Sequence, residues 1–491
     1  MPSVNAGRKS LPFAVGHVNR CSWSCRERSQ DSLLLADFGV LLYAMKTTLR
    51  HFLDAFLLSL VIMYALAGAA QTGAAETSAR SATNPPTRIT EYSLPADKLE
   101  KAHALYIVEG WIYLISTVYG FGIMFFFVHL RWAAKFRDCA ERVSRSRLVQ
   151  AFIVIPLFTS SLWTLLLPPL LYGHHIGLRF GLSVQGWGSW FRDRGVELLI
   201  TCVVGVFVGW ILYFVIHKSP RLWWLYFWFA VIPISAFVVF ITPAVIDPMF
   251  NKFEPLDSTQ PQLVSALEAV VQRAGLTIPR SRMFVMKASA KVTGSNAYVT
   301  GFGSTKRVVV WDTAITKLSV PELQVVFGHE MGHYVLDHVV KGFIFAMLVA
   351  LGLFYCCYRV ATWALRTQGG RWQLRGLDDW ASMPLLLLIA SVLMFVSSPI
   401  TNGFSRYLEH QADTYGLEVT HGMVPDSSQV AAQSFQHLGE EWLDYPFASR
   451  LTIFWLWDHP ATPDRVRYAL EYDPWATGQA PEFVKDSPPQ R

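Results

Sequence analysis

Long apolar segments separated by polar ones dominate the chain. Six of these runs are long enough to cross a bilayer as a helix, which needs about 20 apolar residues; they cover residues 106–130, 148–172, 196–216, 222–246, 342–362 and 380–400. Three prolines interrupt the second run, and spans tolerate such breaks where neighbouring helices bond the freed backbone groups. The pattern predicts a mainly α-helical, multi-pass integral membrane protein in contact with the lipid bilayer.

The N-terminal region follows a different pattern. Residues 1–44 are polar and rich in Arg and Ser, and we interpret them as a non-native extension ahead of a true start at Met45. Residues 45–72 combine a basic start, a short apolar core and small residues, as a secretory signal peptide does. An uncleaved first membrane helix is the alternative, and the residues leave both open. Residues 73–105 begin as a small, polar stretch, and we expect a linker there.

The polar segment 247–335, between the fourth and fifth runs, carries shorter periodicities. Residues 260–276 have apolar positions at helical spacing. Three stretches alternate as strands do and predict a small sheet, namely 282–289, 296–301 and 306–313. Ser319 and Glu322 form a capping box at a helix start. We expect this last helix to run into the fifth span.

Composition and charge agree with a membrane protein. Of the 491 residues, 52% are hydrophobic and 16% are charged, whereas soluble domains carry about 25% charged residues. The net charge of +6 comes without a block of Lys and Arg interleaved with aromatics, so we expect no nucleic-acid partner. The six cysteines form no paired CxxC signature, so a metal would need histidine and carboxylate ligands.

The stretch "VVFGHEMGHYVLDH" (325–338) carries the strongest chemical signal. His329 and His333 are one helical turn apart and share a face, with Glu330 beside them. HExxH on a helix is typical of a zinc site, in which the imidazoles bind the metal and the glutamate is the general base. An ordinary pair of histidines near a membrane interface is the alternative. His338 is expected to lie off the ligand face.

A catalytic zinc needs a third protein ligand and an open position. The stretch "NGFSRYLEHQADTYG" (402–416) places Glu409 and Asp413 one turn apart on a predicted helix. Glu409 is the candidate third ligand, and Asp413 the candidate acceptor of a ligating histidine's N–H. An exposed acidic pair is the alternative.

A late stretch, "DHPATPDRVRYAL" (458–470), offers hydrogen-bond donors. His459 and Arg465 could serve a developing oxyanion. On the residues alone, a loop histidine and a helix arginine without a catalytic role are the favoured alternative.

Five stretches together resemble the integral-membrane zinc CAAX prenyl endoproteases. In chain order they are "ITPAVIDPMFNKFEPL" (241–256), "SNAYVTGFGSTKRVVVWDT" (295–313), "GHEMGH" (328–333), "SRYLEHQAD" (405–413) and "HPATPDR" (459–465). The resemblance covers roughly residues 100–470, and the combination is far more specific than HExxH alone. It implies one Zn²⁺ per chain, with Glu330 as catalytic acid/base and three ligands, His329, His333 and Glu409.

The same resemblance implies roles for four further residues. Asp413 matches a position cast as a proton donor, and we interpret it as the partner that orients a ligand. His459 and Arg465 match positions that help to stabilise the transition state. Asn296 would lie on an edge strand that pairs with extended substrate.

The family fold is a ring of seven membrane helices around a water-filled chamber, closed at one end by a gluzincin-like zinc domain. It implies a four-helix membrane region similar to the CAAX protease N-terminal part at 106–246. A zinc metallopeptidase domain at 247–470 would include two spans, 342–362 and 380–400, and a polar tail would follow at 471–491. A seventh span would require an uncleaved first helix.

The resulting hypothesis is a membrane-embedded zinc metalloendopeptidase, in which zinc-activated water and the base Glu330 hydrolyse peptide bonds of peptide or protein substrates, prenylated ones included. A quality-control protease of non-prenylated substrates shares this chemistry. A transporter or channel with an incidental HExxH predicts charges inside several spans, yet Glu109 and Glu197 lie near span starts. A zinc-binding scaffold without turnover would not need Glu330.

Loop charges predict an orientation and a location. The 131–147 loop carries six basic residues and the 173–195 loop carries three. The positive-inside rule then places 131–147 in the cytoplasm and 247–335 on the opposite side. Together with a signal peptide, this favours a bacterial inner (plasma) membrane protein.

Overall fold

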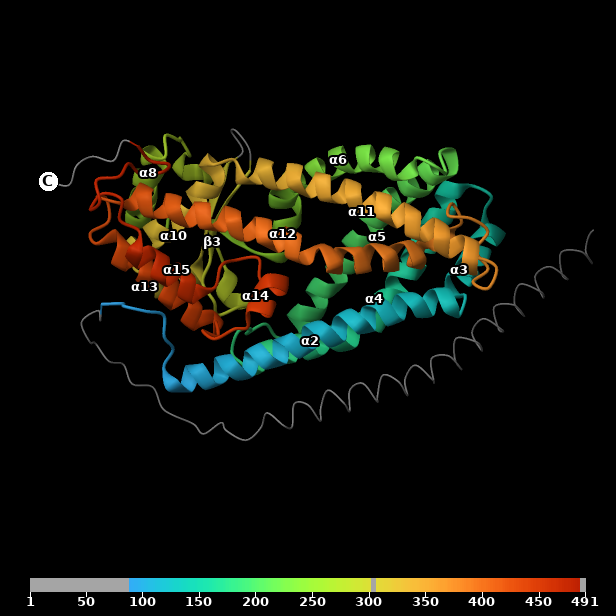
Figure 1. Ribbon diagram of the computed structural model, residues 1–491, viewed down its shortest axis with the longest axis horizontal. Coiled ribbons are helices and arrows are strands. Elements are labelled where there is room, and N and C mark those ends of the chain that lie inside the picture. Colours follow the sequence, from blue (N-terminus) through green and yellow to red (C-terminus); the bar gives the residue numbers. More distant parts are fainter. Residues whose placement is uncertain (1–87, 302–305, 486–491) are drawn as a thin grey trace, which may run out of the picture. The chain divides into compact units, whose positions relative to one another are not determined.

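The computed structural model describes residues 88–301 and 306–485 (Figure 1). The expected extension at 1–44 and the signal peptide or first span at 45–72 lie outside the described residues. Within the described part, each predicted apolar run falls largely in one long helix, the fourth continuing into a π-helical turn at Thr242–Ile246, and six candidate spans result. They are α2 (Ala96–His129), α4 (Arg147–Arg179), α5 (Trp187–Lys218), α6 (Trp223–Ile241), α11 (His338–Gln368) and α12 (Met383–Thr420). The expected helical membrane bundle is therefore confirmed.

The spans expose apolar side chains because their outer surfaces face lipid. In the most hydropathic windows of Trp223–Phe250 and His338–Gln368, 0% of the residues are buried by protein. The helix α4 stays continuous through its prolines. Pro169 has no N–H to bond the carbonyl of Leu165, and the Tyr119 hydroxyl of α2 donates to that oxygen at 2.9 Å. A neighbouring helix thus satisfies the group that the proline frees.

A cavity of about 800 Å³ lies between α2, α4, α11 and α12. Most of its lining is apolar, with Phe121, Leu162 and Leu353 among the contributors. Hydroxyl groups of Ser116 and Thr401 also reach it. The cavity therefore lies among four of the six candidate spans, and its wall is mostly apolar.

A four-stranded mixed sheet forms between the fourth and fifth spans. Its strands are β1 (Phe253–Pro255), β2 (Met283–Met286), β3 (Ala297–Thr300) and β4 (Arg307–Trp311), in the order β1-β2-β4-β3. β2 and β4 pair in parallel, whereas β1 and β3 join antiparallel. The predicted strands are confirmed, and β3 forms an edge.

Helices cover this sheet and complete a second core. The helix α8 (Pro261–Arg273) corresponds to the predicted helix at 260–276. The shared core joins α8, the sheet, α10 (Val320–Val335) and the end of α12 through Leu267, Val308, Phe327, Met331 and Val419, among others. The remaining helices are α3 (Trp132–Val143), α7 (Asp247–Phe250), α9 (Asp312–Lys317), α13 (Ser427–Trp442), α14 (Arg450–Leu456) and α15 (Thr462–Glu471).

The helix α10 begins as predicted and ends earlier than predicted. Its capping box is present, since the Glu322 carboxylate accepts the Ser319 N–H at 2.8 Å. We expected the helix to continue into the fifth span. Instead it stops at Val335, Asp337 adopts a left-handed conformation with φ +55°, and α11 restarts at His338. Asp tolerates this conformation better than most residues, and no Gly or Pro marks the break.

Small residues bring α10 and α12 into close contact. Gly328 and Gly332 on α10 face Ala412 and Gly416 on α12. A Cβ on Gly416 would lie 2.9 Å from the backbone nitrogen of His329, and a Cβ on Gly332 would lie 3.1 Å from the Cα of Ala412. The two backbones can approach this closely only because side chains are missing at the contact.

Gly416→Ala is therefore expected to destabilise the fold, because the added methyl group forces α10 and α12 apart. Overpacking of this kind typically costs about 1–3 kcal/mol. A lower unfolding temperature of the detergent-solubilised protein is the measurement. Gly352→Ala is the matched control, since a Cβ there meets nothing within 4 Å. An unfolding temperature unchanged by Gly416→Ala would contradict the packing argument.

Candidate metal centre

Three side chains from α10 and α12 converge on one point. The Nε2 atoms of His329 and His333 lie 3.1 Å apart. Glu409 Oε2 lies 3.3 Å from His329 Nε2, and Glu409 Oε1 lies 3.4 Å from His333 Nε2. Ligands about 2.0–2.1 Å from a tetrahedral zinc are separated by about 3.3 Å. The two glutamate distances end on different oxygens, so the carboxylate faces both nitrogens, and this spacing fits two imidazoles and one carboxylate around a single zinc ion.

The donor set also has the electrostatics of a cation site. Among the described residues, this trio is the group of His and carboxylate side chains close enough to hold a metal ion. Glu409 Oε2 is buried, and imidazole nitrogens of His329 and His459 face it at 3.3 and 3.4 Å. Burial disfavours charge on His329, but hydrogen bonds to Asp413 and Glu409 outweigh it and raise the pKa of its imidazole to about 10. A buried pocket that favours positive charge this strongly fits a divalent metal.

Asp413 connects the first histidine to the C-terminal helix α15. Its Oδ1 lies 2.7 Å from His329 Nδ1, which leaves His329 Nε2 directed at the centre. Arg465 donates to both Asp413 oxygens, at 2.9 and 2.6 Å. The guanidinium also lies over the ring of Phe435, with Cζ 4.1 Å from its centroid. Arg465 thus uses its Nε and Nη2 groups to hold Asp413.

Glu330 lies on the same helix, between the two histidines, and is half-buried. Burial raises the pKa of its carboxyl group, while the neighbouring His329 and His333 oppose that shift. A carboxylate with a raised pKa is better matched to accepting and returning a proton near neutral pH.

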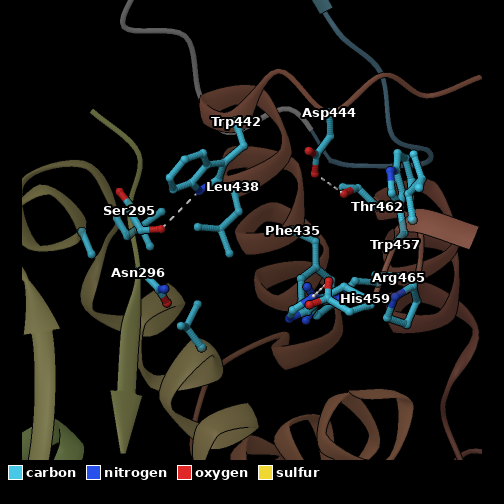
Figure 2. Close-up of a pocket in the computed structure, with 16 residues that line it drawn as sticks. Ser295, Asn296, Phe435, Leu438, Trp442, Asp444, Trp457, His459, Thr462 and Arg465 are labelled. Carbon is cyan, nitrogen blue, oxygen red and sulfur yellow. Dashed lines mark hydrogen bonds and ion pairs between the residues drawn. The ribbon is translucent and has the colours of Figure 1, made fainter. Parts of the chain in front are cut away.

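A cleft of about 460 Å³ adjoins this centre (Figure 2). His459 and Arg465 lie beside Phe435 on one side, and Asn296, immediately before β3, lies across from them. His459 Nε2 is 3.4 Å from Glu409 Oε2. Its Nδ1 is 2.8 Å from Asp458, a hydrogen bond that raises the pKa of the His459 imidazole. All eight residues named from the sequence therefore lie at the centre or along its cleft.

Sequence reasoning missed two neighbours of these residues. Asp458 was not singled out, although it holds His459. His338 was expected off the ligand face, and it is not in the ligand triangle, yet its Nδ1 lies 3.1 Å from His333 Nδ1. The local break at Asp337 brings it there, and nothing in the pattern of the sequence signals that break.

Comparisons with known proteins agree with this architecture. The profile of peptidase family M48 matches residues 257–473, and that of the CAAX prenyl protease N-terminal region, described as five membrane helices, matches residues 76–252. The uncharacterized metalloprotease YhfN of Bacillus subtilis is 32% identical over 364 residues, which cover 74% of this chain and 83% of that protein.

Two further relatives extend the comparison. The CAAX prenyl protease 1 homolog of Dictyostelium discoideum is 29% identical over 268 residues, 53% of this chain and 60% of that protein. The crystal structure of S. mikatae Ste24p superposes with a TM-score of 0.66 at 23% identity, over 77% of this chain and 89% of that one, a likeness of fold. None of these matches favours a transporter or channel. The chain belongs to peptidase family M48, as a membrane metalloprotease similar to the CAAX prenyl proteases.

Proposed function

We propose that the protein is a zinc metalloendopeptidase in which His329, His333 and Glu409 bind one zinc ion and Glu330 is the general acid/base. The convergence of three side chains carries this proposal: the two imidazole Nε2 atoms are 3.1 Å apart, and the Glu409 carboxylate lies 3.3 Å from one through Oε2 and 3.4 Å from the other through Oε1. Two imidazoles and a carboxylate are a typical ligand set for catalytic zinc, which keeps a fourth position open.

The surrounding residues then have separate roles in the reaction. Bound zinc supplies Lewis acidity and lowers the pKa of water to about 7. Glu330 accepts the proton of the attacking water and returns it to the leaving amine. His459, held by Asp458 at the cleft, donates a hydrogen bond to the developing oxyanion. Arg465 acts through Asp413, whose negative charge it balances beside His329.

The edge strand β3 supports an extended peptide as substrate. β3 pairs with β4 on one side only, so its other edge offers backbone groups to an added strand. Asn296 precedes β3, is exposed and lines the same cleft as His459. We therefore assign Asn296 to binding of substrate backbone or side chain.

C-terminal prenylated peptides are the substrate class that we favour. The largely apolar cavity of about 800 Å³ has a lining suited to a hydrocarbon chain. Relatives in several organisms carry the name CAAX prenyl protease 1. A quality-control protease of unmodified peptides is the competing function, and substrate comparison separates the two.

We further propose a bacterial inner (plasma) membrane location, supported by the Bacillus subtilis relative. The basic 131–147 region contacts the connector between α11 and α12, since Arg131 donates to the Arg371 carbonyl and Arg147 to that of Asp378. Both connectors thus lie at one end of the bundle, and that end is assigned to the cytoplasm.

The division into a membrane region at 106–246, a peptidase domain at 247–470 and a tail at 471–491 is also proposed.

Glu330→Gln is expected to retain zinc and to lose about 10²–10⁴-fold in peptide cleavage, because it removes the proton acceptor without removing a ligand. Glu409→Ala is expected to weaken zinc binding itself. Zinc content and cleavage rate, measured on the same purified samples, distinguish the two variants. Full activity in Glu330→Gln would overturn the assigned roles.

Farnesylated peptides are expected to be cleaved with a higher kcat/KM than the same peptides without the lipid, because the cavity would bind the hydrocarbon. The unmodified peptide is the control. Equal kcat/KM for both would favour the quality-control function and leave the zinc chemistry intact.

Single cysteines introduced at Ser146 and Ser258, both exposed, test the orientation in a background without the native cysteines. A membrane-impermeant maleimide applied to intact spheroplasts is expected to label Ser258→Cys and to spare Ser146→Cys. The reverse labelling pattern would place the peptidase domain in the cytoplasm.

A further inference from the structure

His338 contacts a proposed zinc ligand, although it is no ligand itself. It is the first residue of α11 and only 3% exposed. Its Nδ1 lies 3.1 Å from His333 Nδ1, and the two rings are inclined at 79° with centroids 5.1 Å apart. This geometry is that of one imidazole donating a hydrogen bond to the lone pair of the other.

The direction of this hydrogen bond follows from the ligand geometry. His333 presents its Nε2 to the centre, 3.1 Å from His329 Nε2 and 3.4 Å from Glu409. A neutral imidazole whose Nε2 lone pair binds a metal carries its proton on Nδ1. His333 therefore donates from Nδ1, and His338 accepts with an unprotonated Nδ1.

The proton of His338 must then lie on Nε2. That nitrogen is buried and makes no hydrogen bond of good geometry, and the same holds for the Gln411 amide oxygen. On α12, the Gln411 amide nitrogen donates to the Tyr407 hydroxyl at 3.1 Å. The nitrogen of His338 that makes a hydrogen bond among the described residues is therefore Nδ1, which faces His333.

We propose that His338 is a positioning residue that fixes the tautomer and ring orientation of His333 for zinc binding. The inference rests on the proposed function, in which His333 is a ligand. The two histidine ligands are then held by partners of different charge. Asp413 is an anion whose charge Arg465 offsets, whereas His338 is neutral and adds no charge to the pocket.

The neutral partner has a physical consequence. Glu330, Glu409 and Asp413 already crowd one small volume, and another carboxylate there would add like-charge repulsion. A histidine acceptor orients His333 without that cost. The αL break at Asp337 is what allows a residue only five positions later to face back toward His333.

The test compares zinc affinity, measured by chelator competition on purified detergent-solubilised protein. His338→Phe keeps a ring and removes the acceptor, and it is expected to weaken zinc binding about 10- to 100-fold, as loss of a residue that holds a ligand typically does. His338→Asn places an oxygen close to the position of Nδ1, so its affinity is expected nearer to wild type. His338→Leu replaces the phenylalanine variant if that protein does not fold.

Controls separate positioning from packing. His174→Phe alters another buried histidine, which lies in α4, stacks on Trp190 of α5 and is not part of the donor group, and its zinc affinity is expected to equal wild type. The unfolding temperature of each metal-free protein reports packing alone. Equal zinc affinity in wild type and His338→Phe would overturn the proposal.

Two other results are informative. Equal weakening in His338→Phe and His338→Asn would also overturn it, since the hydrogen bond would then not matter. In both cases, loss of zinc binding in the His333→Ala variant would still support the proposed function. A wild-type protein that binds no zinc would overturn the proposed function and this inference together.

Discussion

The close approach of α10 and α12 is the constraint on which the rest of the site depends. Two residue pairs without bulky side chains, Gly328 with Gly416 and Gly332 with Ala412, let the helix backbones almost touch. His329 directly follows the first of these glycines, and Glu409 lies one turn before Ala412. Because the backbones are so close, short side chains from both helices can meet at one point. Larger residues at the contact would separate the donor atoms beyond the span of a metal ion.

The need to balance buried charge explains why a segment distant in the sequence contacts this site. Glu409 and Asp413 are buried carboxylates, and a buried charge requires a partner. Arg465 from α15 supplies the opposite charge to Asp413, and a metal bound at the donor group would supply it to Glu409. Phe435 of α13 lies under the guanidinium and restricts its position. The C-terminal helices therefore help to hold the donor group, although its three side chains come from α10 and α12.

The bilayer imposes the remaining conditions. A hydrolytic centre needs water, whereas apolar spans exclude it. The chain must therefore pass from a site that water can reach, at Glu330, to a lipid-facing helix in the body of α11. The break at Asp337 makes this change within two residues and ends the helix that carries His329 and His333 before the lipid-facing one begins. On the membrane side, Tyr119 bonds the carbonyl that Pro169 frees in α4. The apolar cavity among the spans is thus built from helices with satisfied backbones.

Much of this protein follows from local pattern. Apolar runs determine the spans, because lipid demands continuous hydrophobic helices; the capping box at Ser319 determines where α10 begins; and the spacing of His329, Glu330 and His333 places them together on one helix. The pairing of Asp413 with Arg465, the approach of His459 to Glu409 and the contact of His338 with His333 were decided by tertiary structure. The first two contacts join segments that are far apart in the sequence. The third depends on the left-handed conformation of Asp337, which no local pattern marks. Periodicity records which face of a helix is apolar, but it carries no information on how two helices approach each other, and that distance is what makes three side chains into a metal site.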